Sequence, residues 1–247
     1  MTDPGEDGSG TVRLYHGTTD GAADCIQTEG WTHVDVAAMV EEVAVHHGES
    51  SDEVWRWLRR WARFATFEGR GDSAWFCGSR TSAQGWAERA PEARWEALWA
   101  IWSIRNGVEL NPYEPDAQGP WNLPAAAAWH TREMSAFGAT VLTVEVPLDS
   151  LRASVSEHDY EWLREGTDLE DLPEIKLELP IRPEFIVGRE AVDRRVDFIA
   201  AAALLGLSND ELTEAIRAGV IREPDQPEIT GTSWTWPWSE LSQRIAE

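Results

Sequence analysis

The sequence is poor in positive charge. A single lysine, Lys176, stands among 21 basic residues, against 44 acidic ones, and the formal net charge is -23 at pH 7. Because a field of this sign repels phosphate backbones, it argues against nucleic acid as a partner.

Cysteines and long apolar runs are also scarce. The two cysteines, Cys25 and Cys77, lie far apart with no CxxC spacing, which excludes a disulfide framework or a zinc ribbon. No run approaches the roughly 18 apolar residues of a membrane span, and the N-terminus has no secretory signal pattern. We therefore expect a cytoplasmic protein without membrane contact.

The histidines do not predict a metal site. His46, His47 and His33 are not accompanied by a second pair at ligand spacing. We expect no metal.

Composition divides the chain into three parts. Residues 1–10 are rich in Gly, Asp and Ser and predict a disordered leader. Residues 11–195 mix helical and strand patterns and predict one α+β domain. From residue 196 an Ala/Leu-rich pattern predicts a small helical module over 196–247, in which the capping box Ser208-x-x-Glu211 begins a helix that reaches Ala218.

Periodicity and turn residues predict the elements of the large domain. Capping boxes (S/T-x-x-E/Q) at Ser50 and Thr81 predict the starts of two helices. The helix that begins at Thr81 is expected to reach about residue 104. The segment Asn106–Pro124 predicts an extended loop. The expected helices are 21–29, two within 34–67, 81–104 and 125–137, and the expected strands are 12–15, 74–77, 140–146, 175–179 and 185–187.

Three short segments carry residues suited to chemistry. Leu14-Tyr15-His16-Gly17-Thr18-Thr19 puts an imidazole between a strand and a helix N-terminus. Ser73-Ala74-Trp75-Phe76-Cys77-Gly78-Ser79 forms a strand before a helix, and Pro173 to Ile186 contains Glu174, Glu178 and Glu184. A strand-ending turn, a core tryptophan and solvated carboxylates are the simpler explanations for these segments.

The order of these segments resembles the ADP-ribosyltransferase superfamily. In that family a His-Gly-Thr strand is followed by an aromatic-Phe strand and then by a glutamate strand. The resemblance implies a split, mostly antiparallel sheet with helical insertions. It departs from the family at Trp75, which stands where the family has a tyrosine.

The resemblance also implies roles for individual residues. NAD would be the substrate, with Glu174 as the catalytic glutamate and with Glu178 and Glu184 as alternatives. His16 and Trp75 would act at the ribose and at the nicotinamide, beside Gly17 and Thr18. Ser79 and Arg80 would lie near the phosphates, and Arg13 is a weaker candidate.

The C-terminal module resembles the helix-turn-helix of excisionase and MerR-type proteins. A DNA-reading version needs basic residues, yet residues 197–247 hold nine acidic residues and three arginines. A protein contact, or packing against the rest of the chain, agrees better with this charge.

The sequence therefore predicts an NAD-dependent ADP-ribosyltransferase or NAD glycohydrolase whose acceptor is a protein or a small molecule. The alternative is an inactive domain of the same fold that binds a partner through its acidic face and some of its 15 tryptophans.

Overall fold

The computed structural model describes residues 10–32, 36–60, 73–89, 93–108, 120–152, 155–165, 175–178, 180–225 and 235–246. Helices and small antiparallel sheets alternate along these residues, so the chain has the expected α+β composition. The capping box at Ser208 is confirmed: its hydroxyl accepts from the Glu211 N–H, and the Glu211 carboxylate accepts from the Ser208 N–H.

The chain divides into two compact units. The first consists of Met1–Val34, Gly69–Ala90 and Ala139–Val192, and the second of Asp35–Glu68, Pro91–Gly138 and Asp193–Glu247. The border at Val192 lies near the start of the expected C-terminal module. However, the second unit also includes segments that the sequence analysis assigned to the large domain.

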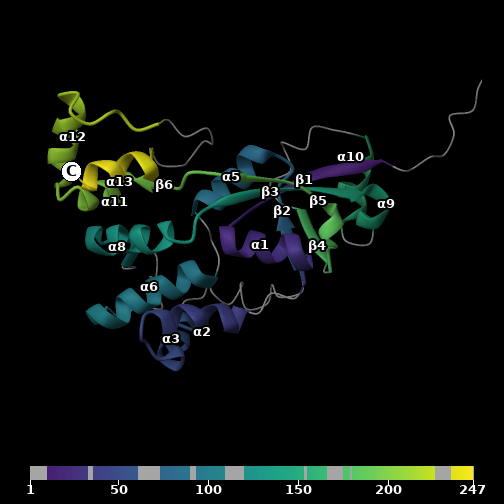
Figure 1. The fold of residues 1–247 in the computed structure, drawn as a ribbon, viewed down its shortest axis with the longest axis horizontal. Helices are drawn as coiled ribbons and strands as arrows, with labels where there is room; N and C mark the ends of the chain where they lie inside the picture. Colours follow the sequence, from purple (N-terminus) through teal and green to yellow (C-terminus); the bar gives the residue numbers. More distant parts are fainter. Residues whose placement is uncertain are drawn as a thin grey trace, which may run out of the picture. The chain divides into compact units, whose positions relative to one another are not determined.

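The first unit is built on two antiparallel sheets. Strands β1 (Thr11–Thr18), β3 (Thr140–Pro147) and β5 (Ile186–Ala191) lie side by side in the order β1-β3-β5 (Figure 1). Strands β2 (Ser73–Phe76) and β4 (Ile175–Glu178) form the other sheet. A single bridge between Tyr15 and Cys77 connects β1 to the end of β2.

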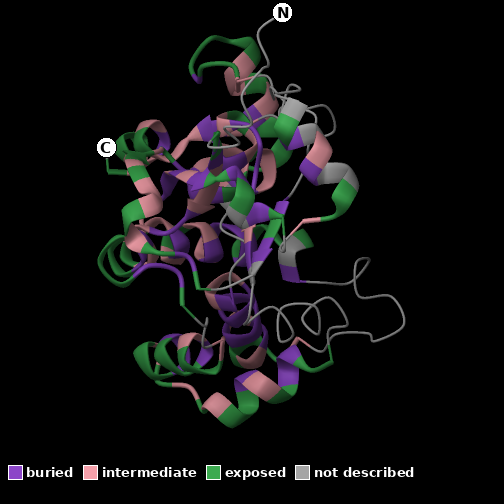
Figure 2. Cartoon of the chain, turned by 90° about the vertical axis from the view of Figure 1, so that its right-hand side faces the viewer, coloured by how far each residue is buried: buried purple, intermediate pink, exposed green. Residues whose placement is uncertain are grey.

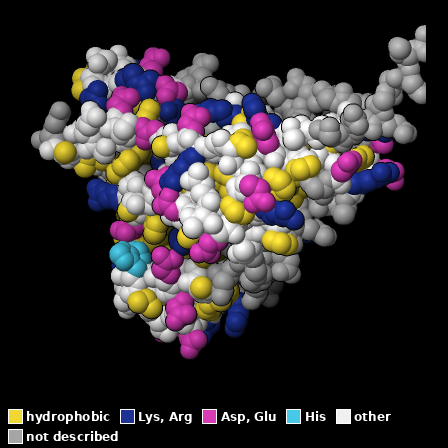
Figure 3. Space-filling view, turned by 45° about the vertical axis from the view of Figure 1, so that its right-hand side comes forward, with side chains coloured by type: hydrophobic (Ala, Val, Ile, Leu, Met, Phe, Trp, Pro, Cys, Tyr) yellow, Lys and Arg dark blue, Asp and Glu magenta, His cyan; other side chains and the backbone are white. Residues whose placement is uncertain are grey.

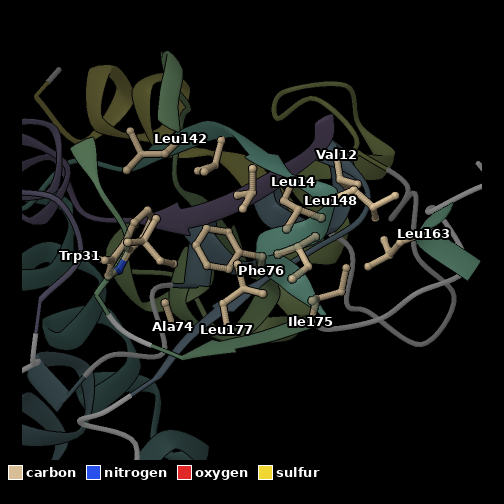
Figure 4. Close-up of a cluster of buried hydrophobic side chains, with 14 of the residues drawn as sticks. Val12, Leu14, Trp31, Ala74, Phe76, Leu142, Leu148, Leu163, Ile175 and Leu177 are labelled. Carbon is tan, nitrogen blue, oxygen red and sulfur yellow. The ribbon is translucent and has the colours of Figure 1, made fainter. Parts of the chain in front are cut away.

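The core of the first unit lies between these sheets and their helices. Alternate residues of the strands point inward, and Val12, Leu14, Phe76, Leu142 and Leu177 are all buried in it (Figure 4). This alternation is the pattern of a strand with one face in an apolar core. The helices of the unit are α1 (Asp20–Glu29), α5 (Arg80–Arg89), α9 (Leu148–Leu151) and α10 (Glu157–Glu165), with a 3-10 turn η3 (Pro183–Phe185).

The second unit is mainly helical. Helix α6 (Ala93–Asn106) packs against α2 (Val36–His46), α3 (Ser51–Leu58) and α8 (Pro124–Ser135), and α11 (Phe198–Leu204) packs against α8. Helices of the chain carry both buried and exposed residues (Figure 2). Strands β6 (Arg195–Asp197) and β7 (Thr235–Pro237) form a two-stranded antiparallel sheet. The other elements are η1 (Pro120–Asn122), α12 (Asn209–Arg217) and α13 (Trp238–Ala246).

Three local predictions were wrong. The expected helix 81–104 is two helices, α5 and α6, and α5 begins at Arg80, where Ser79 Oγ accepts from the Ser82 N–H. Ser50 is the N-cap of α3, so the predicted helix start is confirmed, but its side chain does not make the expected cap bond. Strand β1 does not end at Tyr15, because it pairs with β3 as far as Thr18.

Candidate functional site

His16 is held at the junction of the first two sequence segments. Its Nδ1 lies 2.7 Å from the Trp75 carbonyl oxygen, and the bridge between Tyr15 and Cys77 brings the two strands together here. The bridge consists of two backbone hydrogen bonds, of 2.9 and 2.7 Å. Two segments nearly sixty residues apart in the sequence are therefore neighbours in the fold.

The hydrogen bond fixes the proton on the imidazole of His16. Because a carbonyl oxygen can only accept, Nδ1 is the donor, and in the neutral ring Nε2 carries the lone pair. Two aromatic rings hold this orientation: Trp31 meets the imidazole edge-on with centroids 4.6 Å apart, and Phe76 lies at 5.6 Å. The half-buried His16, when neutral, therefore carries its proton on Nδ1 and its lone pair on Nε2.

Trp31 was not singled out from the sequence. It follows Gly30, which ends α1 at a φ of 77°, and its backbone pairs with Ile181 through hydrogen bonds of 2.8 and 2.9 Å. Its indole also packs on Phe76, with centroids 4.9 Å apart. The only sequence signal for this role was an aromatic residue directly after a helix-ending glycine.

Gly17 and Thr18 lie in β1, beneath α5. A Cβ on Gly17 would sit 2.0 Å from the Ala83 carbonyl oxygen and 2.4 Å from the Ala87 nitrogen. The glycine therefore allows helix and strand to approach closely. Thr18 is buried, and Thr19 forms the N-cap of α1 by accepting from the Ala22 N–H. Packing accounts for this part of the motif without a ligand.

The arginines near these strands are paired with carboxylates. Arg80 binds both oxygens of Glu190 and donates to Gln84 at 2.8 Å, and its hydrogen bond lowers the pKa of Glu190. Arg13 donates to Glu145 on the neighbouring strand, at 2.6 and 3.1 Å. Ser79 is buried and donates to Ser82 at 2.9 Å. Acidic and basic side chains also alternate over the surface in Figure 3.

The three candidate glutamates have different positions. Glu174 lies outside the described residues. Glu178 stands opposite Ser73 in the ladder between β2 and β4. Glu184 lies in η3; its side chain is 59% exposed, and its Oε1 lies 3.6 Å from Arg182 Nη1. Because η3 follows Ile181, the bridging partner of Trp31, Glu184 is connected to the surroundings of His16 through a short stretch of backbone.

The comparisons give no relative from which a role could be transferred. No known protein family, curated protein or solved structure matches the chain. Within the described ranges, no three metal-binding side chains gather as they would around an ion. None of the helices in those ranges has the length and apolarity needed to cross a membrane.

Proposed function

We propose that the first unit binds NAD and cleaves the bond between nicotinamide and ribose, transferring ADP-ribose to a protein, a small molecule or water. The observation that carries this proposal is the hydrogen bond between His16 and the Trp75 carbonyl. It joins the imidazole that would accept from a ribose hydroxyl to the backbone of the residue whose indole would stack on nicotinamide.

The chemistry requires a carboxylate in addition to these two residues. Cleavage passes through a positively charged, oxocarbenium-like ribose, which a glutamate beside the sugar stabilises while it orients the 2′-hydroxyl. Glu174 remains the first choice from the resemblance, with Glu178 and Glu184 as alternatives. The fold favours Glu184, because η3 follows Ile181, whose backbone pairs with Trp31, and Trp31 packs on His16.

The test is nicotinamide release from NAD by the purified protein, alone and with cell lysate. We expect release from the wild type, and loss in His16→Ala and in one of Glu174→Gln, Glu178→Gln and Glu184→Gln. Glu223→Gln, an exposed acidic position in the second unit, is the matched control. Absence of release by the wild type in both conditions would contradict an enzymatic function.

A second candidate is a domain that binds a nucleotide without turning it over. Two observations favour it: Trp75 replaces the tyrosine expected in the family, and Arg80 is already bound by Glu190. The same assay separates the two candidates when calorimetry with NAD accompanies it. Saturable binding without release would select the binding domain.

A further inference from the structure

Lys176 stands directly opposite Trp75. The antiparallel ladder between β2 and β4 pairs Trp75 with Lys176, flanked by the pairs of Ala74 with Leu177 and Phe76 with Ile175. In such a ladder, the Cβ atoms of opposite residues lie about 4.5–5.5 Å apart on one face. The lysine is therefore a side-chain neighbour of the proposed nicotinamide-stacking residue.

The two faces of this ladder have different surroundings. The residues flanking Trp75 and Lys176 are all buried, at 1–4% exposure, and point into the core of Figure 4. Because side chains alternate along a strand, Trp75 and Lys176 point to the other face. There Trp75 is partly buried and Lys176 is exposed. An indole and an ammonium group thus share one face of this ladder.

Lys176 differs from the nearby arginines, within the described part of the chain, in the carboxylates that pair with it. Arg13 is paired with Glu145 and Arg80 with Glu190. Among the residues that the structure describes, no carboxylate pairs with the Lys176 ammonium. In a chain with a net charge of -23, such a cation is a rare point of attraction for an anion.

We propose that Lys176 binds a phosphate group of a dinucleotide whose ring stacks on Trp75. This inference rests on the proposed function and assigns the phosphate contact to Lys176, in place of the expected Ser79 and Arg80. A lysine ammonium offers three donors on a flexible stem, which suits a phosphate. No bond is formed or broken at Lys176, so its role is to bind.

The single lysine makes a direct test possible. Reductive ¹³C-methylation keeps the charge of the amine and labels only Lys176 and the chain's N-terminus. Loss of one signal in Lys176→Arg assigns the lysine. We expect inorganic pyrophosphate to shift the Lys176 signal saturably, with the N-terminal signal as an internal reference. A shift no larger than that with sodium chloride at equal ionic strength would overturn the inference.

Kinetics with NAD provide the second arm. We expect Lys176→Gln to raise KM for NAD by roughly tenfold with a smaller change in kcat, and Lys176→Arg to recover most of the loss because it keeps the charge. Arg164→Gln, which removes an exposed charge on α10, should leave KM unchanged. Equal KM values in the wild type and Lys176→Gln would overturn the assignment.

The two arms separate this inference from the proposed function. If the wild type releases no nicotinamide, the proposed function fails, and the pyrophosphate titration alone decides whether Lys176 binds phosphate. If nicotinamide is released but neither KM nor the lysine signal responds, the enzyme stands and the role of Lys176 is rejected.

Discussion

His130 makes the stability of the second unit dependent on pH. It lies in α8 at 2% exposure, with its ring stacked on Trp99 at 3.9 Å and edge-on to Trp95 at 4.3 Å. Its Nε2 donates to the Trp95 carbonyl at 3.0 Å. Burial lowers the pKa of His130 to about 3, opposed by this hydrogen bond and assisted by the positive charge of Arg194.

The sign and size of the effect follow from linkage. The unfolded chain binds a proton at His130 near the ordinary pKa of 6.5, whereas the folded chain binds it only near 3. The stabilisation is therefore fully present above pH 6.5 and is lost progressively as the pH falls towards 3. With these two values, the free energy of unfolding falls by about 2 kcal/mol between pH 8 and pH 5.

Urea unfolding at pH 8 and pH 5 measures this loss. Carboxylates contribute to acid sensitivity as well, so the informative quantity is the difference between the wild type and His130→Gln, which keeps a donor but cannot titrate. We expect the variant to lose about 2 kcal/mol less than the wild type over this interval. Equal losses in the two proteins, or an NMR titration of folded His130 near pH 6.5, would refute the reasoning.

Three further predictions concern packing, capping and an ion pair, each measured by urea unfolding at pH 7. Gly17→Ala should destabilise the chain by roughly 1–3 kcal/mol, because its Cβ meets the backbone of α5, and an unchanged midpoint would contradict this close approach. Ser208→Ala should cost about 1 kcal/mol through the lost cap, whereas Ser50→Ala, which loses no cap bond, should cost little; equal costs would refute the distinction. Hydrogen bonds from two arginines lower the pKa of Asp225 from 3.8 to about 2, so its contribution is present above pH 3.8 and is lost as the pH falls through about 2. Because this side chain is 39% exposed, Asp225→Asn should cost only about 1 kcal/mol, and a cost no greater than that of Glu223→Gln would contradict the pairing.

Local sequence patterns predicted which helices and strands exist better than they predicted the residues at which each one begins and ends. The strand at 140–146 and the helix at Ser208 have strong local signals, β-branched alternation and a capping box, and both were found. The end of β1 was wrong because Gly17 indicates a turn in isolation, while pairing with β3 keeps it extended. That pairing joins residues more than a hundred positions apart and leaves no local signal.

For the candidate site too, the sequence indicated individual residues but not the contacts between them. The sequence identified His16 and Trp75, but it could not show that the imidazole binds the backbone of Trp75. Arg80 was expected near phosphates because arginine suits them; the structure pairs it with Glu190, which belongs to a strand near the end of the first unit. Such pairing between residues far apart in the sequence decides which cations a ligand can reach. For this reason the sequence alone did not indicate Lys176 as a phosphate-binding residue.

The His-Gly-Thr segment has two physical explanations that mutagenesis of its glycine cannot separate. Gly17 permits α5 to pack on β1, so Gly17→Ala would lower activity by disturbing this packing even if the glycine never touched a ligand. His16 and Lys176 are better probes, because the imidazole is only half-buried and the ammonium is exposed. A loss of NAD binding in His16→Ala and Lys176→Gln, at unchanged unfolding free energy, would require a ligand at this surface. The same loss accompanied by unfolding would instead support the packing explanation.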